Sequence, residues 1–280
     1  MNKLKALFAS VFITFNALGT IYTVVQIFTS PIVLIWIAAF VSLGIGAYFF
    51  SIIMLRHTPT TSTYLTPYLI INLIATILVV ILFFLGGSEV ALILAGMATF
   101  GWLAYVFWYS DISDRNKDQL KVGMLLDNLS FEDVDGQAVR LNDISSGPKV
   151  ILFYRGNWCP FCVAQVKDLA AEYETIKKLG AEIIFISSQH AGHTKKLSRS
   201  LNIGAHFLID TNLKNAKSLG IDHEHGIPLG MELLGYESDT VMPTALVLDK
   251  NNLIIYSNLT DVYRVRPEPS EFINILKTQL

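Results

Sequence analysis

The sequence predicts a chain of two parts, a four-span α-helical transmembrane domain followed by an α/β domain that lies in water. Three observations support this prediction. Residues 1–110 carry only four charged side chains, and 52% of all 280 residues are hydrophobic. The same part contains four apolar runs, each close to the roughly 20 residues that a helix needs to cross a bilayer. The rest of the chain alternates strand and helix patterns, as in an α/β sheet covered on both faces.

The apolar runs set the limits of the first domain. They are residues 7–29, 32–55, 65–85 and 90–109. A water-facing surface of this size would need many more charges, because its outside must be solvated. None of the runs contains a charged residue, and an ion pathway usually shows as an intramembrane charge. We therefore expect residues 1–110 to form an antiparallel helical anchor in the lipid bilayer, joined to the second domain by a connector at 111–121.

Basic residues near the span ends predict the orientation of the anchor. With four spans, both termini and the middle loop share one side of the membrane, and the other side holds only Glu89. The shared side carries six basic residues, which are Lys3, Lys5, Arg56, Arg115, Lys117 and Lys121. This bias predicts a multi-pass plasma (inner) membrane protein whose C-terminal domain lies in the cytoplasm.

Small residues four positions apart allow helices to approach closely. Two such pairs occur in the spans, Ser42 with Gly46 and Ala91 with Ala95. We expect them to pack within the bundle, and a homodimer seam is the alternative.

The second domain, residues 122–280, is predicted from hydrophobic periodicity and turn signals. We expect a hairpin over 131–141, strands at 149–154, 182–187 and 207–209, and a late hairpin of strands 244–249 and 253–257. Helices are expected at 159–179, from about 190 to 201, and at 213–219 and 268–280. The net charge of −2 and the lack of a basic tract argue against a nucleic-acid partner.

Cys159 and Cys162 are the only cysteines in the chain, and they lie where a buried strand gives way to a helix. One CxxC pair supplies only two of the four ligands of a zinc site. By residue type alone, His223 and His225 could supply the other two. The strand–helix context instead favours dithiol redox chemistry without metal or cofactor. A helix N-terminus stabilises a thiolate, so we expect an exposed, reactive Cys159 with Arg155 nearby, and Cys162 as the resolving thiol.

Four further residues are candidates for positioning a substrate. Trp158 and Pro160 flank Cys159, and proline suits the first helical turn because its missing N–H is not needed there. Met242 and Pro243 directly precede the strand ALVLD, where a cis-proline loop could face the cysteines and offer backbone groups to an extended substrate. An ordinary loop proline is the alternative.

Residues 122–280 resemble the thioredoxin-fold redoxins of the alkyl-hydroperoxide-reductase/thiol-specific-antioxidant (peroxiredoxin-like) family. The stretches that carry the resemblance are VG at 122–123, FEDVDGQAVRLNDI, KVILFYRGNWCPFC, AEIIFISSQ, FLIDTNLKNAKSLGI, MPTALVLD and VRPEP. The resemblance implies a thioredoxin-like fold, with Cys159 as the attacking and Cys162 as the resolving cysteine. It also implies a disulfide or hydroperoxide substrate and an external thiol reductant.

Two departures from the family pattern affect the predicted function. Typical peroxidatic sites carry a threonine or serine three residues before the cysteine, where Gly156 stands, and an arginine before the late strand, where Met242 and Pro243 stand. Arg155 or Arg264 could substitute for that arginine. We therefore favour a membrane-anchored thiol–disulfide oxidoreductase, with a peroxiredoxin-like thiol peroxidase of antioxidant function as the alternative. A non-catalytic redox-sensing or partner-binding membrane module is the second alternative.

Four histidines have no assigned role. His190 and His193 follow a strand end, where active sites collect in α/β sheets, and His223 and His225 lie in an insertion at 222–239. The insertion is either a substrate-selecting cap or a solvated loop.

Overall fold

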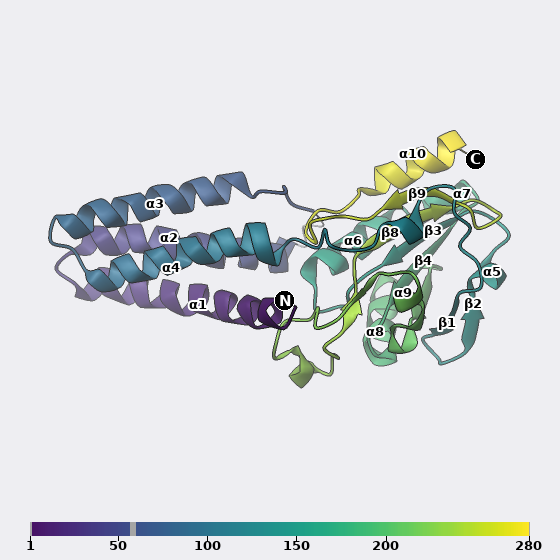
Figure 1. Cartoon of the computed structure of the whole chain (residues 1–280), viewed down its shortest axis with the longest axis horizontal. Coiled ribbons are helices and arrows are strands. Elements are labelled where there is room, and N and C mark those ends of the chain that lie inside the picture. The colour runs from purple at the N-terminus through teal and green to yellow at the C-terminus, as the bar shows by residue number, and fades with distance from the viewer. Residues whose placement is uncertain (1, 57–59, 280) are drawn as a thin grey trace. The chain divides into compact units, whose positions relative to one another are not determined.

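The computed structural model describes residues 2–56 and 60–279. Backbone contacts divide the chain into two compact units, and the boundary between them lies between Asp111 and Ile112. Figure 1 shows the first unit as helices only and the second as a sheet with helices.

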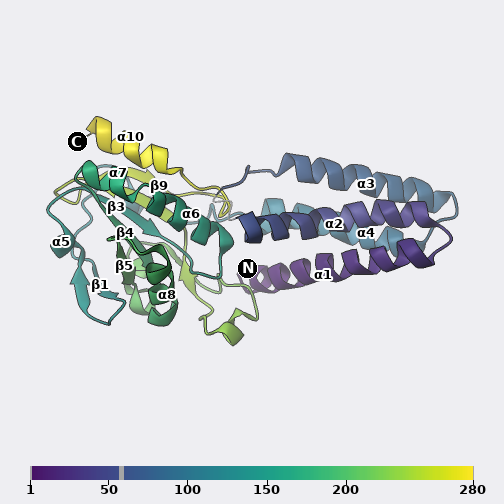
Figure 2. The ribbon, with the colours of Figure 1, turned by 180° about the vertical axis from the view of Figure 1, so that it is seen from behind.

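The first unit contains four helices that run side by side (Figures 1 and 2). They are α1 (Asn2–Thr29), α2 (Val33–Arg56), α3 (Thr66–Phe84) and α4 (Glu89–Ala104), and a π-helical turn, Tyr105–Tyr109, continues the last. All four are long and apolar enough to cross a membrane. They match the four predicted runs, although α1 begins five residues earlier than expected.

Small and polar residues face the inside of this unit. Ser42, Ala91 and Ala95 are fully buried, and a side chain at Gly46 would collide with Asn16. The Thr76 hydroxyl lies 2.9 Å from that of Ser42 and 2.8 Å from that of Thr99. The small-residue pairs therefore pack within the bundle, as the first of the two interpretations expected.

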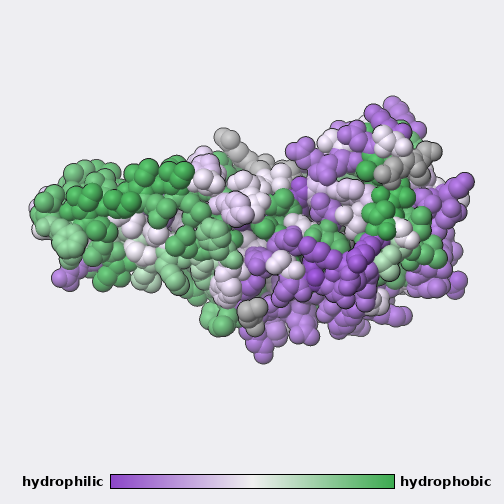
Figure 3. Space-filling model, turned by 45° about the horizontal axis from the view of Figure 1, so that its top comes forward, coloured by the Kyte–Doolittle hydropathy of each residue, from purple (hydrophilic) through white to green (hydrophobic). Residues whose placement is uncertain are grey.

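The outer surface of the helical unit is apolar. Leu18, Ile74 and Phe100 are examples, with 62%, 63% and 74% of their surface exposed. Figure 3 shows hydrophobic residues covering most of the visible surface of these helices. An apolar exterior suits a helical bundle in hydrocarbon, where the backbone polar groups must be satisfied within each helix.

The second unit is built on a seven-stranded mixed sheet of order β2-β1-β5-β4-β3-β8-β9. The strands are β1 (Ser130–Asp133), β2 (Ala138–Arg140), β3 (Lys149–Phe153), β4 (Glu182–Ser187), β5 (His206–Ile209), β8 (Thr244–Leu248) and β9 (Ile254–Asn258). β3, β4 and β5 are parallel, and β8 pairs antiparallel with β3 along its full length. Every residue of β3 and β8 is buried, so these two strands form the centre of the core.

Helices connect the parallel strands and cover the sheet. They are α5 (Leu141–Ile144), α6 (Pro160–Ala171), α7 (Tyr173–Lys178), α8 (Ala191–Leu201), α9 (Lys214–Ser218) and α10 (Pro269–Gln279), with short 3-10 turns η2 (Asp118–Leu120), η3 (Thr211–Leu213) and η4 (Met231–Leu234). α7 packs on β4, α8 on β5 and α10 on β9. This arrangement places the start of α6 directly after the central strand β3.

Two features differ from the sequence-based expectation. The helix expected over 159–179 is divided at Glu172, whose amide bonds to the carbonyl of Leu169 three residues back instead of four. A two-stranded ribbon, β6 (Asp222–His223) with β7 (Thr240–Val241), closes the base of the insertion. Strands of two residues are too short to produce a periodic pattern, so the ribbon left no signal in the sequence.

Candidate functional site

The cysteine pair lies at the start of α6. β3 ends at Phe153, and Cys159 is the N-cap of the helix, with Pro160 as its first residue. The carbonyl of Cys159 accepts from the amides of Cys162, at 3.0 Å, and of Val163, at 3.1 Å. The strand–loop–helix placement predicted for the CxxC pair is therefore present, and both thiols are free.

Both cysteines are buried, and the expectation of an exposed Cys159 is wrong. Cys159 is 1% exposed and Cys162 is fully buried. A helix N-terminus is often open to solvent, but here tertiary packing covers it. Any substrate must enter the protein to reach either sulfur.

A buried arginine contacts the pair. Arg266, which is 5% exposed, lies beyond β9, and its Nη2 donates to the sulfur of Cys162 at 3.7 Å. Burial lowers the pKa of Arg266, whereas the charge of the nearby cysteines raises it. Sequence reasoning missed this residue, although the stretch VRPEP contains it.

A second guanidinium lies beside the first cysteine. Arg155, which is 4% exposed, stacks over the rings of Trp158 and Tyr263, with centroid distances of 4.6 and 5.1 Å. It also donates to the carbonyl of Gly226 in the insertion, and its own carbonyl accepts from the Thr240 hydroxyl at 2.7 Å. The structure thus brings together Arg155 and Trp158, which sequence reasoning selected separately.

The two thiols differ in acidity. Burial raises the pKa of Cys162, but the hydrogen bond from Cys159 and the charges of Arg266 and Arg155 outweigh it and lower the pKa to about 6. Burial and the hydrogen bond to Cys162 raise the pKa of Cys159 well above its usual range. The expectation that Cys159 has the lowered pKa is therefore not met, because burial and the contact with Cys162 outweigh the charges of Arg155 and Arg266, which lower the pKa of Cys159 as well.

A buried amide holds the loop that precedes the cysteines. The Oε1 of Gln189 accepts from the amide of Asn157 at 2.8 Å. The Nε2 of Gln189 donates to the hydroxyl of Tyr154 and to Oδ1 of Asn157, both at 3.0 Å, and lies 3.2 Å from the hydroxyl of Thr194. These bonds tie residues 154–157 to the end of β4 and the start of α8.

Replacing Gln189 by alanine is expected to loosen this loop. The change leaves the amide of Asn157 and the hydroxyl of Tyr154 without their partner, and a lost hydrogen bond costs about 1 kcal/mol. Hydrogen exchange of residues 154–159, measured by mass spectrometry, should become about fivefold faster. Gln137→Ala, on the exposed β1–β2 turn, is the control and should leave these amides unchanged. Equal exchange in both variants would show that Gln189 does not hold the loop.

The proline loop differs from the expectation. Within residues 2–56 and 60–279 no peptide bond is cis, so the expectation of a cis-proline at Pro243 is wrong. Its carbonyl accepts from Nη1 of Arg115 at 2.8 Å, and the amide of Met242 donates to the carbonyl of Ile221 at 2.6 Å. The carbonyl of Met242 accepts from the hydroxyl of Thr244 at 3.1 Å. These backbone groups are already bonded within the protein and are not offered to an extended substrate.

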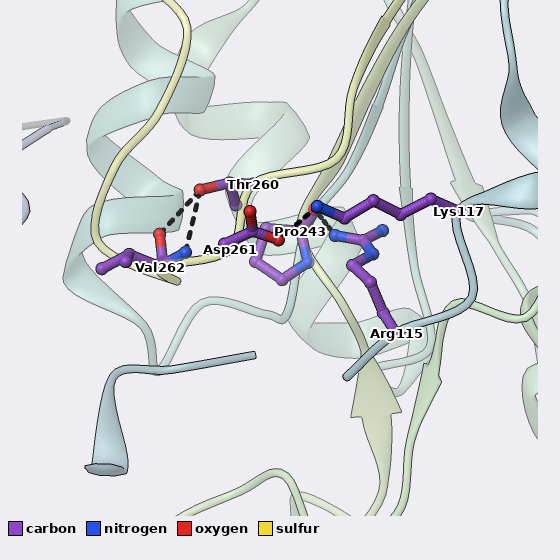
Figure 4. A network of polar contacts seen from close by, with 6 residues as sticks. All are labelled: Arg115, Lys117, Pro243, Thr260, Asp261 and Val262. Atoms are coloured by element: carbon purple, nitrogen blue, oxygen red, sulfur yellow. Dashed lines mark hydrogen bonds and ion pairs between the residues drawn. The ribbon is translucent and has the colours of Figure 1, made fainter. Parts of the chain in front are cut away.

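The connector supplies the residues that hold this loop (Figure 4). Arg115 also donates to the hydroxyl of Thr244 at 2.5 Å, and burial, together with the charge of Arg266, lowers the pKa of Arg115 to about 10. Lys117 pairs with Asp261 at 2.5 Å, but both side chains are about half exposed, and such pairs contribute little. The connector residues are therefore part of the second unit's structure.

Comparison with known proteins identifies the second unit. Residues 122–257 match the family model described as the AhpC/TSA family. Residues 122–257 form an AhpC/TSA-family domain. Peroxiredoxin Q, chloroplastic, from Oryza sativa subsp. japonica is 32% identical over 140 residues, covering 49% of this chain and 58% of that protein. Peroxiredoxin Q, chloroplastic, from Gentiana triflora is 30% identical over 140 residues, with the same coverages.

The fold agrees with this assignment. The reduced Prx3 of Vibrio vulnificus in complex with hydrogen peroxide matches with a TM-score of 0.50 and 14% identity, over 57% of this chain and 97% of that one. The AhpC/TSA domain thus has a thioredoxin-like, peroxiredoxin-type fold. The chain spans 58% of the length of the rice relative, and the family match includes neither residues 1–121 nor Arg266.

A cavity of about 270 Å³ in the AhpC/TSA domain adjoins the cysteine loop. Arg155 and Gln189 line it from the loop side, and Tyr236 and Asp239 line it from the insertion. The insertion therefore forms part of the cavity wall, while Leu233 at its tip is 92% exposed. Its role as a substrate-selecting cap stays a prediction.

The four histidines have structural roles in the AhpC/TSA domain or lie in the ribbon and turn of the insertion. His190 caps α8 by accepting from the amide of Gly192 at 3.2 Å, and the ring of His193 stacks on Tyr236 with centroids 4.2 Å apart. His223 lies in β6, and the amide of His225 donates to Asp239 at 2.8 Å. In the described part of the chain, no three His, Cys, Asp or Glu residues are grouped as metal ligands.

Proposed function

We propose that the chain is a membrane-anchored, peroxiredoxin-like thiol peroxidase. Its Cys159–Cys162 dithiol reduces a hydroperoxide and becomes an internal disulfide, which an external thiol reductant then opens. The AhpC/TSA assignment and the peroxiredoxin Q relatives support this reaction. They favour the peroxidase over the thiol–disulfide exchange that the sequence favoured.

The observation that carries the proposal is the buried guanidinium of Arg266 on the sulfur of Cys162. Peroxide attack develops negative charge on the leaving oxygen, and a positioned donor in a water-poor site stabilises that charge. The sequence favoured thiol–disulfide exchange over peroxide reduction because Met242 and Pro243 stand where typical family members have an arginine. Arg266 brings a guanidinium to the thiol from a different segment, and Arg155 adds a second one nearby.

Burial also distinguishes the two reactions. Disulfide exchange with a protein requires the attacking sulfur to be accessible to a bulky partner, and Cys159 and Cys162 are 1% and 0% exposed. A small hydroperoxide needs only a narrow route. The closed site therefore favours hydroperoxide as the oxidising substrate and requires the site to open for the reductant.

Rapid mixing of the reduced full-length chain in detergent with hydrogen peroxide or with insulin disulfides tests the proposal. We expect the second-order rate constant for peroxide to exceed that for the disulfide at least tenfold. The reverse order would restore thiol–disulfide exchange as the first reaction. Reaction with neither substrate would favour the non-catalytic redox-sensing or partner-binding module.

The peroxide reaction is expected to depend on pH through the thiolate. The pKa of Cys162 is lowered to about 6, so the thiolate is lost as pH falls below that value. The rate should therefore be nearly constant from pH 7 to 8 and fall about tenfold for each pH unit well below 6. Stopped-flow rates between pH 4.5 and 8.5 measure this. A rate that rises steadily to pH 9 would show that the reacting thiol has an ordinary or raised pKa.

We also propose that α1 to α4 span the plasma (inner) membrane and that the AhpC/TSA domain lies in the cytoplasm. The support is the apolar length of the four helices and the bias of basic residues. In a chain with both cysteines changed to serine, Asn251→Cys should resist an impermeant maleimide in intact cells, whereas Glu89→Cys should react. Labelling of Asn251→Cys alone would reverse the topology.

A further inference from the structure

We propose that Thr60 and Ile112, which lie outside the AhpC/TSA match, position Arg266 beside the cysteine pair and so set the reactivity of the site. Thr60 follows α2, which ends at Arg56, and Ile112 follows the π-helical turn that ends at Tyr109. Backbone contacts assign both residues to the second unit. The peroxide reaction in this inference rests on the proposed function, whereas the positioning of Arg266 rests on hydrogen bonds to its loop.

The first hydrogen bond fixes the backbone of Arg266. This residue lies on the loop between β9 and α10, and Pro267 and Pro269, which follow it, carry no N–H to bond. The amide of Arg266 donates to the hydroxyl oxygen of Thr60 at 3.0 Å, across 206 positions of the sequence. Thr60 therefore holds the point from which the guanidinium extends toward the cysteines.

The two ends of Arg266 are bonded to different parts of the domain. In the part of the chain that the structure describes, its amide donates to Thr60, its Nη2 donates to the sulfur of Cys162 at 3.7 Å, and its Nε is buried without a partner. A long, flexible side chain loses rotamer freedom when its end is fixed. A fixed amide reduces the further freedom that must be lost to keep the guanidinium at the sulfur.

The connector holds the other end of the same loop. The amide of Ile112, a residue that is only 4% exposed, donates to the carbonyl of Asp261 at 2.8 Å. Next to Asp261, the hydroxyl of Thr260 donates to the carbonyl of Val262 at 2.8 Å and accepts from its amide at 3.2 Å (Figure 4). The loop over 260–266 is thus bonded at both ends by residues that precede the family match, which begins at 122.

The space next to Thr60 leaves little room for a substitute acceptor. Thr60, Gln165, Asp168 and Arg266 are among the residues that line a cavity of about 10 Å³. A cavity of this volume holds one water molecule at most. Loss of the Thr60 hydroxyl therefore leaves the amide of Arg266 poorly satisfied, and the loop is expected to shift.

Thr60→Val in the full-length chain in detergent tests this inference. Valine keeps the shape of threonine but removes the acceptor. We expect peroxide consumption to slow about fivefold, the usual effect of one lost hydrogen bond. The pH midpoint for alkylation of Cys162 by iodoacetamide, assigned by mass spectrometry, should rise by about half a unit. Thr60→Ser keeps the hydroxyl, and Thr278→Val changes an exposed residue of α10, so both variants should leave rate and midpoint unchanged.

A double variant separates positioning of the guanidinium from a general loss of structure. Arg266→Gln leaves no guanidinium to position, so Thr60→Val should change neither quantity further in that chain. An equal effect of Thr60→Val with and without the guanidinium, or no effect in either chain, would overturn the inference. If the unchanged chain consumes no peroxide while Thr60→Val still raises the alkylation midpoint, the proposed peroxidase is wrong and the positioning role stands.

Discussion

Replacing Arg266 by glutamine is expected to slow peroxide consumption about a hundredfold, the usual effect of removing one positioned donor from a developing anion. The guanidinium is buried and donates to Cys162 at 3.7 Å. Glutamine removes the charge that favours the thiolate and the donor that polarises the peroxide. Two changes should therefore appear together. The peroxide rate should fall even at pH values where the thiolate is fully formed, and the pH midpoint for alkylation of Cys162 should rise. Stopped-flow peroxide kinetics and alkylation as a function of pH measure them.

Two further variants control this experiment. Arg266→Lys keeps the charge without the planar fork of donors, so the alkylation midpoint should stay low while the peroxide rate falls only in part. Arg199→Gln removes a guanidinium from the exposed end of α8 and should change neither quantity. An unchanged peroxide rate in Arg266→Gln would remove the observation on which the proposed peroxidase depends.

The parts of the fold that the sequence predicted are those set by local patterns. The apolar runs correspond to α1 to α4, and buried strands such as β3 and β4 appear within a residue of their expected limits. In each case the information lies in a continuous segment, either apolar length or alternation ended by a turn. The CxxC pair was located for the same reason, because a strand before it and a helix after it are both local signals.

The parts that could not be predicted depend on residues far apart in the sequence. Arg266 meets Cys162 across 104 positions. The stretch VRPEP contains Arg266, but no local pattern indicates that its side chain reaches the cysteines. The burial of Cys159 depends on tertiary packing over the helix start, and the N-cap position alone suggested exposure. The proline loop was misjudged because Arg115, from the connector, occupies the carbonyl of Pro243.

The cysteine loop depends on a glycine at its first turn, and Gly156→Ala is expected to have the second large effect. Gly156 has φ of +139°, which L side chains rarely adopt, and an added Cβ would lie 2.9 Å from the indole of Trp158 and 3.1 Å from Oε1 of Gln189. Residues forced into such conformations cost on the order of 1–3 kcal/mol. Because Gln189 holds the loop and Trp158 stacks under Arg155, the added methyl group must displace one of them.

We therefore expect Gly156→Ala to destabilise the AhpC/TSA domain by about 2 kcal/mol, which corresponds to roughly thirtyfold faster exchange of the β3 amides. Peroxide consumption should fall at least tenfold, because the loop carries Arg155 and leads into Cys159. Gly136→Ala is the matched control, since Gly136 also has a positive φ, +82°, but has no atom within 4 Å of an added Cβ. It carries the conformational cost without the collision. If both variants lose the same stability and the same activity, the contacts of Gly156 with Trp158 and Gln189 do not shape the site. If Gly156→Ala shows both the faster exchange and the lower peroxide rate of the two variants, the difference is due to those contacts.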